Sequence, residues 1–405
     1  MTSIIKLAYD KNYICKAGLL INPRLEKAVP RQDIFISGGR IASVGGRESA
    51  ARRAGPTREA VVFNLEHLAV LPPLVDCHVH LALDGKDFAA ARRRWNSPGE
   101  LFRQVQAELL DTVKHGILAV RDGGDRRGIA LRFRNLVRKR DLVGPRILAP
   151  GYAMRKPGTY GSFLGPGVGM DEVEAALDGL AGRGADLVKV IVSGVVSFQE
   201  YGRVGAPQYS AGELAAIVAA ARARGLAVMA HASSDEAVRL AVQAGVDSVE
   251  HGYFAGPDTL QLMAEKGVSW VPTVIPVAAQ LHGRKKGGPG RQERYVLEKT
   301  VDRQLAMINE AAALGVTLGV GTDAGAAGVP HGCGYPEELA LFRRAGLSPA
   351  QVLQCATWNG ARILGLNLGS IEPGRAAALV AVEGNPLFDP GALHRVRYVF
   401  LPPQL

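Results

Sequence analysis

The sequence predicts an α/β fold: a (β/α)8 TIM barrel with a small β-sandwich domain formed by the N- and C-terminal segments. Between residues 72 and 365, eight short apolar runs alternate with amphipathic stretches of helical spacing, whereas the two flanks hold short runs with strand-like alternation. Strands separated by helices are typical of parallel βαβ units that close into a barrel. An open, doubly wound sheet is the alternative, but no Gly-rich fingerprint follows the first run.

The predicted core elements follow each other regularly along the chain. The strand candidates are residues 74–80, 117–122, 146–151, 187–194, 227–231, 248–252, 269–274 and 317–323. The helix candidates are residues 100–115, 128–140, 171–183, 211–224, 235–244, 257–266 and 291–314. We therefore expect residues 71–365 to form the barrel domain.

The flanks have the pattern of a β domain. The segment around Gly38 and Gly39 reads as two alternating runs joined by a Gly-Gly turn, which is a hairpin signal. Residues 369–400 show the same pattern of short alternating runs next to glycines. We therefore expect residues 1–70 and 366–405 to meet in one β-sandwich domain.

Composition excludes several classes of protein. The chain has 405 residues and 47% hydrophobic side chains, which rules out global disorder. No apolar run approaches the roughly 20 residues needed to span a bilayer. The net charge of +10 is scattered along the chain, so neither a nucleic-acid nor a membrane partner is expected. No secretory signal is evident near Lys6, and the four cysteines form no CxxC pair, so a reducing, cytoplasmic location is expected.

Residues that can bind metal ions stand at the ends of several predicted strands. His78 and His80 end the first strand, and alternation along a strand places their side chains on one face. The carboxyl ends of barrel strands form the face where barrel enzymes build their sites. The further candidates are His231, His251 and Asp323 at strand ends and Lys189 within the fourth strand.

Lys189 lies among aliphatic neighbours, and its ordinary pKa of about 10.4 would leave it charged and unable to bind a metal. Burial lowers the pKa of a lysine and favours the neutral amine. A neutral amine can react with CO2 to form a carbamate, whose two oxygens can bridge two cations. We therefore expect a CO2-derived carboxylation of Lys189.

Together these motifs resemble the amidohydrolase superfamily, in its binuclear branch and in the prolidase-like and imidazolonepropionase-related group. The resemblance rests on His78-Val-His80, on Lys189 in Val-Lys-Val-Ile-Val, on Glu-His251-Gly and on Gly-Thr-Asp323-Ala-Gly. It implies two divalent metal ions. Zinc is the ion that the imidazole and oxygen ligands favour most, and manganese, cobalt and iron are the alternatives. By the resemblance, His78, His80 and Asp323 hold one ion, His231 and His251 hold the other, and carboxylated Lys189 bridges them.

The resemblance also implies hydrolysis of a C–N bond by a hydroxide that bridges the two ions. Asp323 is then expected to act as general base and later as general acid. Tyr160, which stands where the group often has a histidine, and His331 are candidate donors to the oxyanion.

Three alternatives remain open at this point. A mononuclear deaminase usually has a Glu where this chain has Ser234, and it has no counterpart of Lys189. An imidazolonepropionase-type cyclic-amide hydrolase can work with one metal. A catalytically inactive scaffold of the same fold would have lost metal ligands, whereas this chain retains all six.

The substrate is expected to be a small molecule such as a dipeptide, an N-acyl amino acid, an amide or a carbamate. The basic loop around Arg284 and Lys286 would suit a substrate that carries a carboxylate. Relatives of this kind often assemble as symmetric multimers, so a homo-oligomer is a further expectation.

Overall fold

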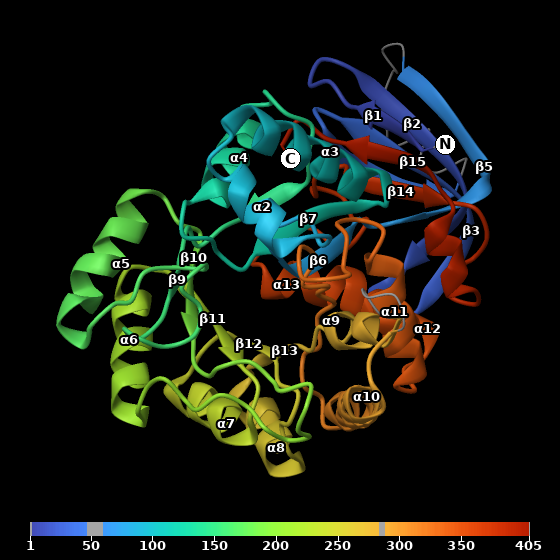
Figure 1. The fold of residues 1–405 in the computed structure, drawn as a ribbon. Helices are drawn as coiled ribbons and strands as arrows, with labels where there is room; N and C mark the ends of the chain where they lie inside the picture. Colours follow the sequence, from blue (N-terminus) through green and yellow to red (C-terminus); the bar gives the residue numbers. More distant parts are fainter. Residues whose placement is uncertain (1, 47–59, 283–287, 405) are drawn as a thin grey trace.

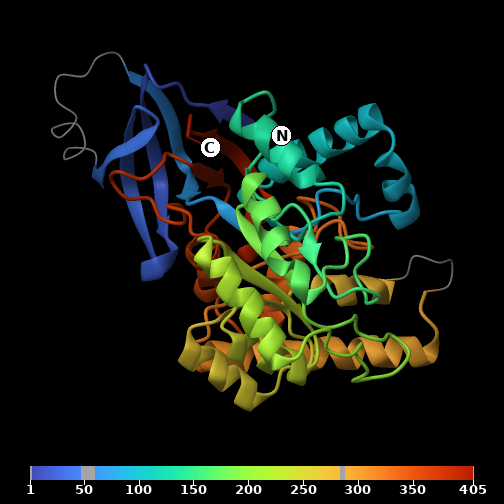
Figure 2. The ribbon, with the colours of Figure 1, turned by 90° about the vertical axis from the view of Figure 1, so that its left-hand side faces the viewer.

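Both ends of the chain enter one seven-stranded sheet in the computed structural model, which describes residues 2–46, 60–282 and 288–404. This terminal sheet lies at one end of the molecule, away from helices α5–α8 (Figures 1 and 2). Its strand order is β1 (Ser3–Lys6), β15 (Val396–Leu401), β14 (Leu379–Val382), β5 (Ala60–Leu71), β2 (Asn12–Asn22), β3 (Lys27–Ser37) and β4 (Arg40–Gly46).

The Gly38-Gly39 turn joins β3 to β4, as the sequence predicts. Both glycines have positive φ, +57° and +71°, which is the backbone that a two-residue hairpin turn needs. A separate apolar core lines this sheet and includes Cys15, Ile34 and Phe400. The two ends of the chain therefore support each other by strand pairing and by shared burial.

The rest of the chain is built on parallel strands in two sheets. One holds β6 (Leu74–Val79), β7 (Ile117–Asp122) and β8 (Arg146–Leu148). The other holds β9 (Ala153–Met154), β10 (Leu187–Ile191), β11 (Ala227–Ala232), β12 (Ser248–His251) and β13 (Ser269–Val271).

Helices separate these strands, close to the predicted ranges. They are α2 (Phe88–Arg94), α3 (Pro98–Lys114), α4 (Ile129–Arg138), α5 (Val173–Gly182), α6 (Ala211–Ala223), α7 (Asp235–Ala244), α8 (Pro257–Lys266), α9 (Ile275–Ala278), α10 (Arg291–Ala313), α11 (Tyr335–Arg344), α12 (Pro349–Gln354) and α13 (Gly360–Ile363). A π-helix (Cys355–Asn359) links the last two, and no described helix has the length and apolar character of a membrane span.

Only the first half of the predicted strand 146–151 forms a strand, β8, and the next strand, β9, begins beyond the predicted range. β8 pairs with β7, and β9 pairs with β10 after the intervening residues bend the chain. The N–H of Asp186, the residue before β10, donates to the carbonyl of Ala149 at 3.0 Å. The chain between β8 and β9 is therefore hydrogen-bonded to the start of β10. The prediction of one continuous strand is therefore corrected.

The predicted strand 317–323 is not a regular strand, although it lies between β13 and β6. The N–H of Trp270 donates to the carbonyl of Thr317 at 2.9 Å, and the N–H of Cys77 donates to the carbonyl of Val320 at 2.8 Å. Asp323 then turns into the left-handed region at φ +55°. This turn and the two glycines at 319 and 321 interrupt the ladder, which is why the segment makes strand-like bonds without strand geometry.

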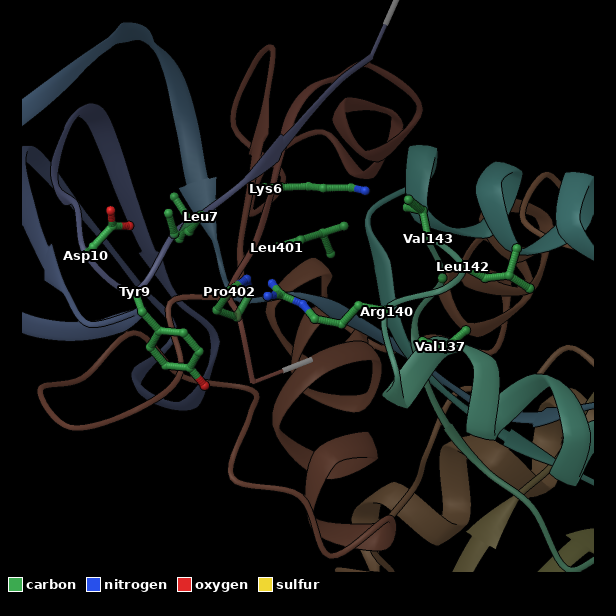
Figure 3. Close-up of a pocket in the computed structure, with 12 residues that line it drawn as sticks. Lys6, Leu7, Tyr9, Asp10, Val137, Arg140, Leu142, Val143, Leu401 and Pro402 are labelled. Atoms are coloured by element: carbon green, nitrogen blue, oxygen red, sulfur yellow. The ribbon is translucent and has the colours of Figure 1, made fainter.

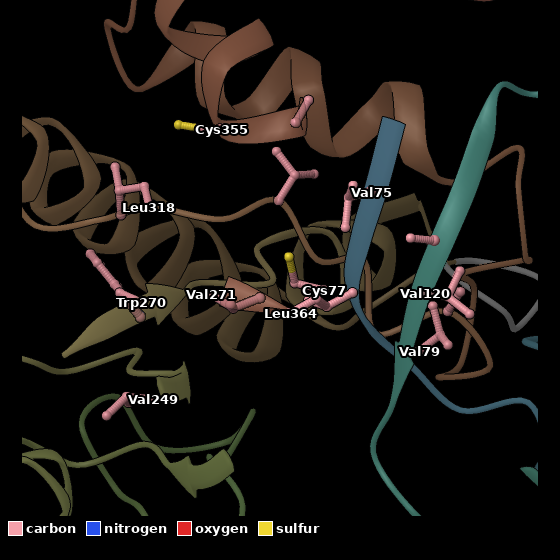
Figure 4. Packing of buried hydrophobic residues seen from close by; sticks show 14 of the residues in the cluster. Val75, Cys77, Val79, Val120, Val249, Trp270, Val271, Leu318, Cys355 and Leu364 are labelled. Carbon is pink, nitrogen blue, oxygen red and sulfur yellow. The ribbon is translucent and has the colours of Figure 1, made fainter. Parts of the chain in front are cut away.

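Alternation along β6 separates its core residues from its functional ones. Val75, Cys77 and Val79 lie in the main hydrophobic cluster (Figure 4). Successive side chains of a strand point to opposite faces, so His78 points away from that cluster. The packing of one face therefore fixes the direction of the histidine on the other.

A cavity of about 630 Å³ lies where the terminal sheet meets the end of α4. Lys6, Leu142, Val143 and Arg140 are among its lining residues (Figure 3). It contains none of the predicted site residues.

Candidate active site

All six predicted metal ligands line one smaller cavity, of about 360 Å³. They come from β6, β10, β11, β12 and the segment after β13, so residues distant in the chain meet at the carboxyl ends of neighbouring strands. The six are His78, His80, Lys189, His231, His251 and Asp323.

Ligand atoms within this set approach each other closely. Oδ1 of Asp323 lies 3.5 Å from Nε2 of His78 and 3.2 Å from Nε2 of His80. One ligand atom each from His78, His251 and Asp323 lies within 4.8 Å of the others. The His231 and His251 rings are 4.5 Å apart between centroids. This spacing allows a shared cation.

Five polar atoms of the cluster are buried without a hydrogen bond to any described residue. Buried polar groups normally have a partner, because an unsatisfied one costs roughly 1–3 kcal/mol. Five unsatisfied atoms around one cavity therefore indicate a missing ligand. The atoms are Nε2 of His78, Nδ1 of His80, Nζ of Lys189, Nε2 of His231 and Oδ1 of Asp323.

The backbone at the cluster is strained. His251 (φ +68°), Thr273 (φ +49°) and Asp323 (φ +55°) adopt left-handed conformations. Such a φ is uncommon for residues other than glycine and is unfavourable for a β-branched residue such as Thr273. Strain of this kind tends to concentrate at functional sites, where the surrounding structure imposes it.

A buried network that the sequence analysis did not predict holds His78. Nδ1 of His78 lies 2.8 Å from Oε2 of Glu250, and Nη2 of Arg121 donates to Oε1 of the same carboxylate at 2.8 Å. Ser248 donates to that oxygen at 2.7 Å. A carboxylate on one nitrogen of a histidine leaves the other nitrogen free to bind a metal and fixes the ring orientation.

Three further side chains hold the neighbouring ligands or the residues next to them. Thr273 Oγ1 lies 2.7 Å from Nδ1 of His251. The Asp76 carboxylate accepts hydrogen bonds from both the N–H (2.9 Å) and the hydroxyl (2.6 Å) of Thr322, and so it anchors the residue before Asp323. Asp122 accepts from the N–H groups of Leu81 (2.8 Å) and Gly124 (2.7 Å). The ligand-bearing loops are therefore fixed by side chains from adjacent strands.

Burial controls the protonation of the cluster. It lowers the pKa of Lys189 to about 8 and that of His231 to about 3. Burial also holds the pKa values of His78 and His251 well below the ordinary histidine value, with the positive charge of Lys189 contributing at His78 and that of His231 at His251. Burial would raise the pKa of Asp323, but the adjacent His78 and His80 rings outweigh it and lower that pKa. Burial would also lower the pKa of His80, but the adjacent Asp323 carboxylate raises it above the ordinary histidine value. Neutral imidazoles such as those of His78, His231 and His251, beside a carboxylate, are forms that bind a metal.

The walls of the cavity are largely apolar and aromatic. Tyr160, one of the predicted oxyanion donors, lines it, with its ring 5.9 Å from that of His231. Gln208 supports this loop by donating to the carbonyl of Tyr160 at 3.1 Å. The remaining wall residues include Leu83, Phe88, Phe163, Leu164, Val195, Val196, Phe198, Tyr253 and Pro276.

The structure does not place His331 in this cavity lining. Nε2 of His331 donates to the carbonyl of Leu83 at 2.9 Å, which ties down the chain that follows His80. The role of His331 as oxyanion donor stays a prediction, and in this structure its Nε2 is engaged with the backbone instead. The other predicted substrate contact, the loop around Arg284 and Lys286, lies outside the described residues.

Two curated proteins resemble this chain, one over most of its length and one over less than half of it. It is 26% identical to an ochratoxinase of Aspergillus niger over 79% of this chain and 71% of that protein. It is 30% identical to an imidazolonepropionase of Deinococcus radiodurans over 44% of this chain and 40% of that protein.

The fold of this chain also resembles that of a solved structure. A Xaa-Pro dipeptidase with bound methionine superposes with a TM-score of 0.82 and 28% identity, over 98% of this chain and 99% of that chain. The sequence profile described as "Amidohydrolase family" matches residues 69–402. The chain therefore belongs to the amidohydrolase family and is a hydrolase that acts on carbon–nitrogen bonds.

Proposed function

We propose that this protein hydrolyses an amide, peptide-like or carbamate bond with two divalent metal ions, most favourably zinc. The observation that carries the proposal is the set of five buried, unsatisfied polar atoms around one cavity. Imidazole nitrogens and carboxylate oxygens are ligands that suit zinc. The relatives act on bonds of this class, since they include an ochratoxinase and a Xaa-Pro dipeptidase.

The six side chains divide into two sets in this proposal. His78, His80 and Asp323 would hold one ion, and the 3.2 Å and 3.5 Å separations of Asp323 from the two histidines support this grouping. His231 and His251 would hold the second. Lys189, carboxylated by CO2, would bridge the two, which its lowered pKa favours because the neutral amine is the form that reacts.

When bound, such ions supply a Lewis acid for the carbonyl oxygen and lower the pKa of a water molecule. The carboxylate of Asp323 would take the proton of the attacking water and pass it to the leaving nitrogen. Tyr160, whose pKa is raised by burial, keeps its hydroxyl proton and can donate a hydrogen bond to the developing oxyanion. The apolar walls exclude water, which strengthens these interactions.

The same proposal includes a closed architecture for the core. We infer that β6–β13 and residues 317–324 form an eight-stranded barrel in which the short strands β8 and β9 together count as one strand, supported by the backbone bonds from residues 317–324 to β13 and β6. The β-sandwich domain of residues 1–70 and 366–405 and the barrel boundaries 71–365 remain part of this proposal. So do a small-molecule substrate, the absence of nucleic-acid and membrane partners, a homo-oligomer and a cytoplasmic location.

One local contact bears on the deaminase alternative. Ser234, at the position where mononuclear deaminases usually have a Glu, accepts a hydrogen bond from the N–H of Ala237 at 3.2 Å and caps α7. Ser234 is used locally as a helix cap and offers no carboxylate that could move a proton as a Glu would. This favours hydrolysis of an amide over deamination.

The proposal can be tested with purified protein loaded with zinc, manganese or cobalt. The panel contains dipeptides, N-acyl amino acids, aryl amides, carbamates and small lactams, and mass spectrometry detects the products. We expect cleavage of at least one open-chain amide or carbamate, lost in Asp323→Asn. Release of ammonia alone, cleavage of cyclic amides alone, or no turnover with any metal would contradict the proposal and favour the deaminase, the cyclic-amide hydrolase or the inactive scaffold.

A further inference from the structure

A third cavity, which shares Phe88 with the active-site cavity, is lined by arginines. It has a volume of about 550 Å³ and lies between α2 and the loop that joins β7 to α4. Both of these elements follow neighbouring strands, α2 after β6 and the loop after β7 (Figure 1). Its lining consists of Phe88, Ala89, Arg92, Arg93, Trp95, Asn96, Arg126 and Arg127.

The four guanidinium groups of this cavity are only partly balanced by acidic groups. The N–H of Ala90 and then the charge of Arg93 lower the pKa of Asp87, so Arg93 has an acidic neighbour. None of them makes an ion pair with a residue that the structure describes, whereas Arg94 of the same helix pairs with Asp84. Of the nearby acidic groups, Asp87 caps α2 by accepting the N–H of Ala90 at 2.9 Å. Asp125 is buried and accepts three backbone N–H groups. The arginine cavity is therefore positively charged.

Two of the four side chains are held in place by neutral contacts. Arg127 donates to Oδ1 of Asn96 at 2.9 Å. The guanidinium carbon of Arg92 lies 5.8 Å from both the Phe88 and the Trp95 ring centroids. Cation–π contacts orient a guanidinium without removing its charge. These arginines thus remain available to an anion.

The arginine cavity is continuous with the active-site wall. Phe88 lines both cavities, and its ring packs edge-on against Phe163, another wall residue, at 5.1 Å between centroids. The N–H of Arg126 donates to the carbonyl of Phe163 at 3.0 Å. Phe88 therefore separates the aromatic wall of the active-site cavity from the guanidinium groups of the arginine cavity, and a long ligand can contact both.

The active-site cavity itself offers no comparable charge to an anion. Apart from Lys189 in the metal-type cluster, no lysine or arginine of the described chain lines it. Burying a carboxylate against apolar walls without a partner is strongly unfavourable. Among the described residues outside the metal-type cluster, guanidinium groups that can bind an anionic group of a substrate in bidentate fashion lie beyond Phe88.

We propose that the arginine cavity is a substrate subsite that binds a carboxylate. The substrate class would be an amide or carbamate in which an apolar spacer separates the scissile bond from the carboxylate, with the spacer in the active-site cavity. This inference rests on the proposed hydrolytic function and adds the substrate class.

The first test measures binding alone, so it does not depend on turnover. Calorimetric titration compares phenylvalerate with the uncharged phenylvaleramide. We expect phenylvalerate to bind about tenfold more tightly than phenylvaleramide. A tenfold difference corresponds to about 1.4 kcal/mol, close to the net contribution of one hydrogen bond to a charged group. The preference should fall with added salt and should be lost in the double variant Arg92→Gln with Arg127→Gln. Equal binding of both compounds, or a preference unaffected by the double variant, would overturn the inference.

The second test uses anilides whose acyl chain ends in a carboxylate or in a carboxamide, with spacers of increasing length. We expect kcat/KM to favour the carboxylate at one spacer length, and the double variant to abolish that advantage. Arg140→Gln, in the larger remote cavity, is the matched control and should preserve it. Hydrolysis of both series with no carboxylate advantage would refute the subsite but leave the proposed function intact. If neither series of anilides is hydrolysed but calorimetry still shows the preference for the carboxylate, the proposed hydrolytic function is refuted instead.

Discussion

The two cavities that contrast most are the larger one beside the terminal sheet and the smaller one at the strand ends. The larger, of about 630 Å³, has exposed charged groups at its edge, among them Lys6 and Arg140. The smaller, of about 360 Å³, contains a buried lysine, four histidines and a carboxylate with unsatisfied polar atoms. Volume therefore does not identify the site. Buried polar groups without partners do, because folding tolerates their cost only where a ligand or a reaction compensates for it.

The largest expected effect comes from removing the buried lysine. Lys189→Met should lower kcat/KM by about 10³-fold or more, because the ions that it bridges supply several kcal/mol of transition-state stabilisation. Lys6→Met, in the larger cavity, is the matched control and should leave the rate within about twofold. Steady-state kinetics on any substrate found in the panel measures both. Comparable losses in the two variants would remove the distinction between the cavities.

The same lysine should reduce the stability of the metal-free protein. Its pKa falls from 10.5 to about 8 on folding, so between these values the unfolded chain binds a proton that the folded chain does not. Stability should therefore decrease by about 3 kcal/mol as the pH falls from about 10.5 to about 8, and Lys189 should contribute no further change below that. Urea unfolding with a chelator present, compared with Lys189→Met, isolates this contribution. A slope that persists in Lys189→Met would assign the effect to another group.

Glu250 should matter for metal affinity rather than for the reaction itself. Glu250→Gln should weaken metal binding by about 10–100-fold, since it disturbs the carboxylate that orients His78. Glu108→Gln is a suitable control: burial raises the pKa of Glu108 to about 8, so an amide resembles the protonated acid present at pH 7. Competition with a metal-binding dye gives both affinities. Unchanged affinity in Glu250→Gln would show that His78 does not need this support.

Filling each cavity should give the smallest effects and the sharpest contrast. Ala326→Phe, in the wall of the active-site cavity, should lower kcat/KM at least about tenfold by excluding substrate. Val143→Phe, in the larger cavity, should leave it within about twofold. Circular dichroism verifies that both variants are folded. A loss in Val143→Phe alone would place the active site in the larger cavity.

The sequence was sufficient to predict which six side chains meet at one cavity, because strand alternation is local. His78 and His80 share a face by spacing alone, and the strand-end positions of His231, His251 and Asp323 follow from the βα pattern. The hairpin at Gly38-Gly39 and the pairing of both chain ends were predictable for the same reason, since turn residues and alternation mark them. Helices such as α7 and α8 match their predicted bounds, because their caps and apolar spacing agree.

Contacts between strands could not be predicted in this way. Glu250, Arg121 and Ser248 meet His78 only through the packing of three strands, although charged residues within apolar strands were a signal for them. The irregular geometry of residues 317–323 depends on Asp323 turning into the left-handed region, which apolar content does not indicate. His331 was expected at the oxyanion, but the fold directs its ring nitrogen to the carbonyl of Leu83. The short helix α2, and with it the arginine cavity, also went unpredicted.

Metal content per chain tests the central claim most directly. Elemental analysis of the purified, metal-loaded protein should find about two divalent ions per chain, as in other two-metal sites, and Lys189→Met should retain at most about one. Two ions in the wild type with a clear loss in the variant would support the account. No more than one ion in the wild type, or two ions retained by Lys189→Met, would contradict it.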